Sequence, residues 1–276
     1  MFFPNKTIFV HIPKTGGTTL RDIIQRQYLS KNILTIPTLE KSENILETVP
    51  SVKINQLEVV QGHLKYGIHL NLNRSAKYFA ILRNPIDRVL STYYYVISQD
   101  NNPQNLSSND NTMSIFEYVN SGINPFLING QTQLISGKTC SINDPLIRSK
   151  ELLSIAKKNI KENFIFTGTT EQFDESILLL KGILRWKSPY YSRANKTKNK
   201  PDYKKIDKKI RDFIKDHNQL DINLYNYVKK SINDKINEGS INFKNELNHF
   251  KNINAIINPI FGFSRAKRFL SKSFKK

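Results

Sequence analysis

The chain has 276 residues, of which 38% are apolar, so it can bury one substantial α/β core. Its 42 Lys and Arg against 23 Asp and Glu give a net charge of +19, which favours an anionic partner such as a nucleotide, an acidic glycan, nucleic acid or an anionic membrane surface. The single cysteine, Cys140, excludes an intramolecular disulfide and a cysteine-based metal cluster, and we interpret it as a small buried thiol.

The first predicted elements are a strand, a tight loop and a helix. Residues 6–12, "KTIFVHI", form a short apolar run that Pro13 ends, which is typical of a buried strand. Residues 18–29 have apolar side chains at helical spacing, and Thr18 or Thr19 is expected to cap this helix. The sequence "PKTGGTT" joins the two.

Two more strands are predicted at residues 57–64, ending at Gly62 and His63, and at residues 77–83, stopped by "NP". A helix is expected from Asp87 to about Ile97. The polar segment 98–112 is rich in Asn and Ser, and it is interpreted as a long surface loop.

Helical patterns follow at residues 113–120, 145–163 and 171–186, with a strand at 163–168 between the last two, and then at 203–217 and 221–237. We predict one domain over residues 1–240 and a basic C-terminal tail over 241–276. The fold class is α/β, a P-loop-like three-layer fold with a central, mostly parallel sheet flanked by helices. Ligands bind such sheets at the carboxyl ends of the strands, where Lys14, His63 and Arg83 should meet.

The loop "PKTGGTT" has the composition of a phosphate cradle. Gly16 and Gly17 let the backbone approach a ligand closely, and helix-start amides, Thr hydroxyls and the Lys14 ammonium can surround a phosphate. It is not the nucleotide triphosphate loop G-x-x-x-x-G-K-[ST], because its lysine precedes the glycines. The alternative is an ordinary Gly-Gly turn beside an exposed lysine.

A second candidate phosphate site lies in "ILRNPIDRVLSTYYY". Arg83 ends a predicted strand and Ser91 follows eight residues later on a predicted helix. A guanidinium and a helix hydroxyl can converge on one phosphate. A solvated arginine and a surface serine are the alternative.

Taken together, "PKTGGTTL" and "RNPIDRVLSTYYY" resemble the paired nucleotide-binding signatures of sulfotransferases that use 3′-phosphoadenosine 5′-phosphosulfate (PAPS). The closest resemblance is to carbohydrate sulfotransferases of the heparan sulfate 2-O-sulfotransferase type and their bacterial relatives. It extends to "QGHLKYGIH", "NGQTQLISG", "NFIFTGTTEQFDESILLLKGIL" and "NKTKNKP", and so covers most of residues 7–201.

The resemblance implies a role for each matching residue. Those expected around the 5′-phosphosulfate are Lys14, Thr15, Gly16, Gly17, Thr18 and Thr19. Arg83 and Ser91 would hold the 3′-phosphate, and the basic segment 193–201, with Asn195, Lys196, Thr197 and Lys198, would close over the donor.

Catalysis is assigned to two of these matching positions. His63 aligns with the family's catalytic histidine, and an imidazole with a pKa near neutrality suits a general base that deprotonates a sugar hydroxyl. Lys14 would also stabilise the oxygen that leaves the sulfur. No metal is expected, because no His, Cys or carboxylate cluster has ligand spacing.

The chain departs from the heparan-type pattern at two positions. Gln61 stands where those enzymes carry another histidine, which puts hexuronic acid as acceptor in doubt. Asn84 replaces a more usual aspartate, a mild change if this residue caps the following helix. Of the other histidines, His11 is interpreted as a core residue, His69 as a candidate for the acceptor cleft, and His217 and His249 as surface residues.

The expected partner is a glycan or glycolipid acceptor, with no nucleic acid, and the acceptor's identity and the oligomeric state stay open. We expect a bacterial, cytoplasmic enzyme, since there is no basic and apolar signal region and no stretch of about 18 apolar residues. One alternative is a P-loop kinase or NTPase, although a Walker lysine and a Mg²⁺-binding acidic residue are not evident. Another is a basic module for nucleic acid or anionic membrane, because residues 261–276 carry six basic residues and could contact a membrane peripherally. A frayed solubilising terminus is the simpler interpretation of that tail.

Overall fold

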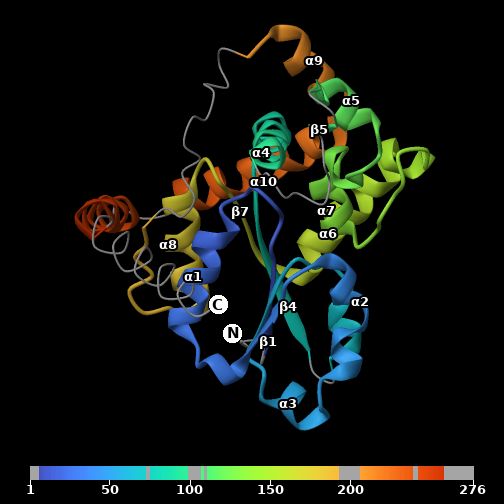
Figure 1. Ribbon diagram of the computed structural model, residues 1–276. Coiled ribbons are helices and arrows are strands. Elements are labelled where there is room, and N and C mark those ends of the chain that lie inside the picture. The colour runs from blue at the N-terminus through green and yellow to red at the C-terminus, as the bar shows by residue number, and fades with distance from the viewer. Residues whose placement is uncertain are drawn as a thin grey trace.

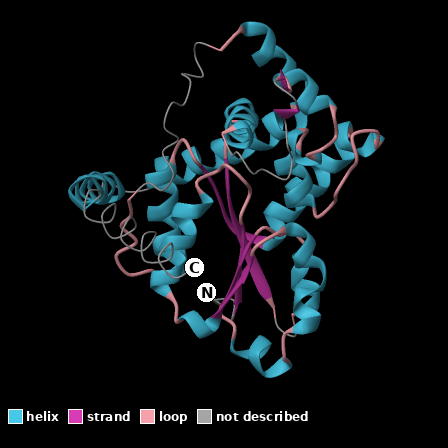
Figure 2. Ribbon diagram, in the orientation of Figure 1, coloured by secondary structure: helices cyan, strands magenta, loops and turns pink. Residues whose placement is uncertain are grey.

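The structure is a computed structural model that describes residues 6–72, 75–98, 107–108, 111–192, 206–238 and 242–257. Its centre is a five-stranded sheet in the order β2-β3-β1-β4-β7, and every pairing in it is parallel. The strands are β1 (Lys6–Val10), β2 (Ile33–Ile36), β3 (Val59–Gly62), β4 (Ala76–Leu82) and β7 (Phe164–Thr169). Figure 1 and Figure 2 show this sheet between two layers of helices, which confirms the predicted α/β class.

Successive side chains of a strand point to opposite faces of the sheet, so β1 contributes to two separate cores. Ile8 and Val10 belong to one buried cluster and Phe9 to the other. The face that carries Phe9 is covered by α1 (Gly17–Gln27) and α8 (Phe173–Leu184). Helices on both faces explain why the strands read as continuous apolar runs rather than as alternating patterns.

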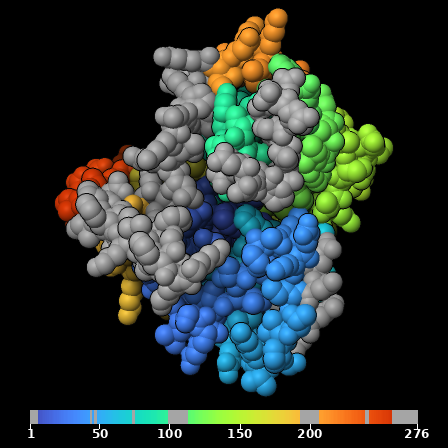
Figure 3. Space-filling view, viewed as in Figure 1, coloured from blue at the N-terminus to red at the C-terminus, as the bar shows by residue number. Residues whose placement is uncertain are grey.

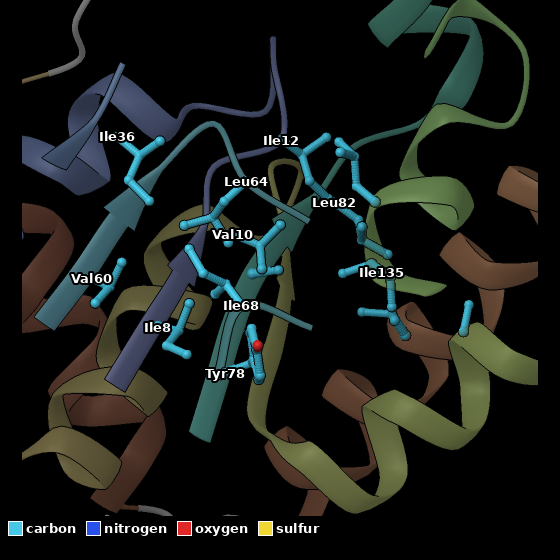
Figure 4. Close-up of a cluster of buried hydrophobic side chains, with 14 of the residues drawn as sticks. Ile8, Val10, Ile12, Ile36, Val60, Leu64, Ile68, Tyr78, Leu82 and Ile135 are labelled. Carbon is cyan, nitrogen blue, oxygen red and sulfur yellow. The ribbon is translucent and has the colours of Figure 1, made fainter. Parts of the chain in front are cut away.

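The opposite face of the sheet is covered by more helices. They are α2 (Leu39–Thr48), α3 (Ser51–Gln56), α6 (Gly130–Ser136), α7 (Lys150–Asn163) and α10 (Gln219–Glu238). Figure 4 shows Ile8, Val10, Val60, Tyr78 and Leu82 of the strands gathered on this face, with Ile135 of α6 beside them.

A third buried cluster lies among α4 (Pro85–Ile97), α5 (Ile115–Asn120), α7 and α9 (Lys208–His217). Cys140 is 1% exposed in this cluster, as the sequence predicted for a buried thiol. These contacts hold α4 in place where it follows the carboxyl end of β4.

Short elements complete the described chain. The 3-10 turns are η1 (Ser30–Asn32), η2 (Ile68–Asn71), η3 (Pro125–Leu127) and η4 (Pro145–Arg148). Segment 98–112, predicted as a loop, contains the two-residue strands β5 (Ser107–Ser108) and β6 (Asn111–Thr112), and the rest of it beyond Ser98 lies outside the described residues.

Residues 242–257, the beginning of the segment assigned to the C-terminal tail, form a helix on the α8 side of the molecule. Phe250 is buried in the core cluster of α1 and α8, and Lys251 pairs with Glu175 at 2.8 Å. Residues 258–276 lie outside the described part of the chain.

Among the described α-helices and the strands of the central sheet, five elements were not predicted: β2, α2, α3, α6 and the helix at 242–257. The strand β2 and the helix α6 are short, and a short segment carries too little periodicity to be recognised. Predicted boundaries elsewhere shifted by a few residues. For example, α4 begins at Pro85 rather than at Asp87, because Pro is tolerated in the first turn of a helix.

Candidate active site

The loop between β1 and α1 lies at the carboxyl end of the sheet. Gly16 is the N-cap of α1 and has a left-handed backbone conformation, with φ of 81°, which favours glycine. No side chain caps this helix, and its first turn contains no acidic residue. The predicted cap by Thr18 or Thr19 is therefore wrong, because the helix already begins at Gly17. The amides of its first turn are left without a side-chain acceptor at the N-cap, which suits an anion.

Gly17 is required by a close approach to His11. A β-carbon at this position would lie 1.9 Å from Cδ2 of the His11 ring, far inside van der Waals contact. His11 is 8% exposed, and burial lowers its pKa to about 3, with further lowering by His63 and Arg21. His11 is therefore a neutral, packed ring beneath the start of α1, as the sequence suggested.

His63 follows the last residue of β3 and stacks on His11. The two ring centroids are 4.5 Å apart, and the rings are inclined by 22°. Its backbone N–H donates to the carbonyl of Ile36 at 3.1 Å, which fixes the residue to the end of β2. Burial lowers the pKa of His63, and a hydrogen bond with the backbone of His11 offsets part of this effect. The half-buried imidazole is therefore neutral at pH 7 and able to accept a proton.

Lys14 adopts positive φ, 68°, which is uncommon for a residue other than glycine. Its carbonyl accepts a hydrogen bond from Nη1 of Arg83 at 3.0 Å. Its ammonium Nζ lies 4.1 Å from the centroid of the Tyr95 ring, a cation–π contact. Burial, followed by the charge of Arg83, lowers the pKa of Lys14 to about 8. The loop and the end of β4 are thus in direct contact through two cationic residues.

Arg83 is held by its main chain as well as by its side chain. Its N–H donates to Oε1 of Gln131 at 2.9 Å, and its carbonyl accepts from Nε2 of the same residue at 2.9 Å. Gln131 itself is fully buried. The direction in which the Arg83 guanidinium leaves the sheet is therefore set by a buried amide.

Asn84 is the N-cap of α4, the role that the sequence indicated for it. Its Oδ1 accepts from the backbone N–H groups of Ile86 and Asp87. Its own N–H donates to Oε1 of Glu171 at 2.9 Å. Asparagine therefore fulfils the capping role without the charge of an aspartate.

Ser91 is half-buried on α4, one helical turn before Tyr95. Residues four apart lie on one face of a helix, so Ser91 and Tyr95 face the same side. Because Tyr95 lies under the Lys14 ammonium, that side of α4 faces the loop. Figure 3 shows this part of the molecule hollowed, with dark-blue atoms from the start of the chain recessed below the blue-green α4.

Thr15 and Thr19 are both buried, at 1% and 5% exposure, while Thr18 is half-buried. The Thr15 hydroxyl donates to the carbonyl of Ile12 at 2.8 Å, so it holds the loop together. Asn195, Lys196, Thr197 and Lys198 lie outside the described residues.

Two further residues assigned from the sequence have hydrogen-bond partners in other strands of the sheet. His69 contacts the Tyr78 hydroxyl at 2.7 Å, and Tyr78 precedes the end of β4 by four residues, about 13 Å along a strand. The expectation that His69 lines the acceptor cleft is therefore not supported by its position. Gln61 is fully buried and donates to the Thr35 hydroxyl at 3.1 Å.

Sequence reasoning missed three residues that shape this edge: Gln131, Tyr95 and Thr170. The Thr170 hydroxyl lies 3.0 Å from the carbonyls of both Thr15 and Leu82, so it ties the loop to β4. All three occur in segments that the family resemblance already included. Their polar or aromatic character gave no separate signal, because a hydrogen-bond partner distant in sequence cannot be read from one chain.

The arrangement brings uncapped helix amides, two cations and a neutral histidine to one edge of the sheet. Such a set can bind phosphate groups and accept a proton. Within the described residues, no group of three His, Cys, Asp or Glu side chains could hold a metal ion, and no helix there is long and apolar enough to cross a membrane.

Comparison with known proteins places the chain in a family. The family model described as "Sulfotransferase family" matches residues 3–228. Among solved structures, the crystal structure of mouse sulfotransferase SULT7A1 complexed with PAP is similar, with 14% identity and a TM-score of 0.42. That similarity covers 77% of this chain and 62% of the mouse chain, which is less than two thirds of the mouse chain. No curated protein sequence matches this chain significantly. Since the family model covers most of its length, the chain belongs to the sulfotransferase family.

Proposed function

We propose that the protein transfers the sulfuryl group of PAPS to a hydroxyl of a carbohydrate. The observation that carries the proposal is the contact between Arg83 and the Lys14 carbonyl at the uncapped start of α1. It joins the two segments whose sequences resemble the 5′-phosphosulfate and 3′-phosphate signatures. Membership of the sulfotransferase family supports the same reaction.

The donor would bind along the edge formed by the loop and α4. The amides at the start of α1 and the Lys14 ammonium suit the 5′-phosphosulfate. Arg83, with its permanently charged and planar guanidinium, and Ser91 suit the 3′-phosphate. The remaining assigned residues, Thr15, Gly16, Gly17, Thr18 and Thr19, shape the loop from which these groups act.

His63 would act as the general base. It accepts the proton of the acceptor hydroxyl, whose oxygen forms a bond to sulfur as the bond from sulfur to the phosphate oxygen breaks. The products are a sulfate ester and adenosine 3′,5′-bisphosphate (PAP). The neutral state of His63 at pH 7 supports this role, because a histidine that is already protonated cannot accept the proton.

Lys14 would stabilise the phosphate oxygen that leaves the sulfur. Negative charge grows on this oxygen in the transition state, so an ammonium there lowers the barrier more than it strengthens ground-state binding. The pKa of about 8 keeps most of the Lys14 population charged at neutral pH. An anionic donor would raise this pKa further.

We propose a carbohydrate acceptor on the resemblance of the motifs to those of carbohydrate sulfotransferases. Gln61, which replaces a histidine of the heparan-type motif, is buried against Thr35 rather than facing an acceptor. We therefore do not extend the proposal to the hexuronic acid of heparan.

Calorimetric titration tests the donor assignment. PAP should bind more tightly than AMP, because only PAP offers a phosphate to Arg83 and Ser91. Equal affinities would contradict the assignment of these two residues. ATP with Mg²⁺ serves as the comparison for a kinase or NTPase, which would bind it more tightly than PAP.

Transfer of radiolabelled sulfate from PAPS tests the acceptor class. Polysaccharides, lipid-linked glycans and small glycosides would be screened beside phenolic and steroid hydroxyls. Label in a carbohydrate supports the proposal, and label confined to the other hydroxyls contradicts it.

A further inference from the structure

We propose that Gln131 and Asp221 are positioning residues that set Arg83 and Ser91 for recognition of a 3′-phosphate. This inference rests on the proposed function, and it assigns the donor specificity of that site to a buried polar network. The network reaches from α10, through the start of α6, to Arg83 and Arg88 of the Arg83–Ser91 segment.

The first step of the network is the pairing of Gln131 with Arg83. One side-chain amide bonds both main-chain groups of Arg83, each at 2.9 Å. Arg83 directly follows β4, where the strand ladder has ended. Gln131 therefore supplies the hydrogen bonds that a neighbouring strand would otherwise provide. A buried main-chain group without a partner is costly, so this pairing strongly selects one orientation of Arg83.

The second step fixes Gln131 itself. Asp221 of α10 accepts from the backbone N–H of Gln131 at 3.1 Å and from the backbone N–H and hydroxyl of Thr132, each at 2.7 Å. Asp221 is fully buried, and its carboxylate lies at the start of α6, where negative charge is favourable. The first turn of α6 is therefore held by a side chain that comes from a distant helix.

The third step connects Asp221 to the helix that carries Ser91. Nη2 of Arg88 lies 3.6 Å from Oδ2 of Asp221, and Arg88 is 2% exposed. The same Nη2 donates to the carbonyl of Phe126 at 2.6 Å. Ser91 lies three residues after Arg88, on the adjacent turn of α4. One carboxylate thus holds α4 by an ion pair, and it holds the main chain of Arg83 through Gln131.

This hydrogen-bond network matters for an anion site because the Arg83 side chain is long. The position of its guanidinium therefore depends on where its backbone is held. Displacement of a binding group by about 1 Å can reduce its contribution severely. Burial lowers the pKa of Arg88, Asp221 opposes this effect, and the positive charge of Arg83 lowers the pKa further, so the two arginines repel each other. Gln131 and Asp221 counter this repulsion, because Gln131 holds the main chain of Arg83 and Asp221 holds the side chain of Arg88.

The test replaces Gln131 by Met, which keeps the length and apolar bulk of the side chain but removes both hydrogen bonds. We expect the affinity for PAP to fall about tenfold or more, while affinity for AMP changes by less than about twofold. With PAPS as substrate, KM should rise and kcat should change little. If Gln131→Met does not fold, Gln131→Asn, whose amide is one methylene short, should show the same selective loss.

Asn159→Leu is the matched control. Asn159 is also buried, and its Nδ2 donates to the carbonyls of Ile135 and Ser136 at the other end of α6. Both variants should melt at lower temperature than the wild type, but only Gln131→Met should lose the preference for PAP over AMP. An unchanged preference in Gln131→Met and Gln131→Asn, or an equal loss in Asn159→Leu, would overturn the inference. A wild-type protein without any preference would instead contradict the proposed function.

Discussion

The rings of His11 and His63 stack with their centroids 4.5 Å apart at the carboxyl ends of β1 and β3. His11 is the more buried of the two, and its ring packs against Gly17 at the start of α1. The proposed base is therefore supported by a ring that rests directly on the proposed donor loop. A substitution at the start of α1 that displaces the His11 ring should therefore also displace His63 and reduce sulfate transfer.

Sulfate transfer should decline in acid, with a midpoint below pH 6.5. The pKa of His63 is lowered, first by burial and then by Arg21, so the neutral form predominates down to that pH. Protonation below the midpoint removes the base. The pH profile of kcat/KM measures this decline, which forms the acid limb of the profile.

Arg21→Gln should move the acid limb to higher pH, because it removes a positive charge that lowers the pKa of His63. Arg26→Gln is the control, as Arg26 lies on the same helix but bonds the carbonyls of Asp22 and Tyr190.

His63→Ala should bind PAP normally and lose nearly all transfer. Near-normal turnover in His63→Ala would remove His63 as the base.

Lys14→Met should lower kcat by about 10²-fold or more, a size typical for the loss of one group that stabilises developing charge. In the wild type, the affinity for PAP should weaken as the pH rises through about 8, because Lys14 is mostly cationic below its pKa and mostly neutral above it. Titrations at pH 7 and pH 9.5 measure this change. An equal pH dependence in Lys14→Met would show that another group titrates.

Gly17→Ala should both destabilise the protein and reduce transfer. Its β-carbon would overlap the His11 ring, so His11 and the stacked His63 must move. We expect a loss of about 1–3 kcal/mol in the free energy of unfolding, as for other overpacked sites. Chemical denaturation and the transfer assay measure the two effects.

Gly182→Ala provides the matched glycine control. Gly182 lies within α8, and a β-carbon there would meet nothing within 4 Å. The substitution should raise stability by up to about 1 kcal/mol, because alanine favours a helix, and it should leave transfer unchanged. A stable and fully active Gly17→Ala would show that His11 does not restrict the loop.

Asp221→Ala should lower the free energy of unfolding by about 3–5 kcal/mol. It leaves Arg88 buried without its acidic partner, and it removes the acceptor for the first amides of α6. Asp216→Ala, which changes an exposed carboxylate on α9, should change stability by less than about 0.5 kcal/mol. Denaturant titration compares the two variants, and similar values would show that the buried pair does not stabilise the fold.

The α/β class with a mostly parallel sheet, four of the five strands of that sheet, and the position of Lys14, His63 and Arg83 at one edge could all be predicted from the sequence. Long apolar runs, Pro and Gly punctuation and the order of the motifs carry this information, because they depend on neighbours in the chain. Residue burial at Cys140 and His11 followed from the same local patterns.

The hydrogen bonds and the ion pair that hold this edge together could not be predicted from the sequence. The Gln131–Arg83 pairing, the Thr170 contacts and the Asp221–Arg88 ion pair join residues that are far apart in the chain. Such contacts satisfy buried polar groups whose partners are chosen by packing, and one sequence does not encode the choice locally. The helix cap expected at Thr18 or Thr19 is absent, because α1 already begins at Gly17. Gly17 packs against the His11 ring, and this contact joins residues of two different elements.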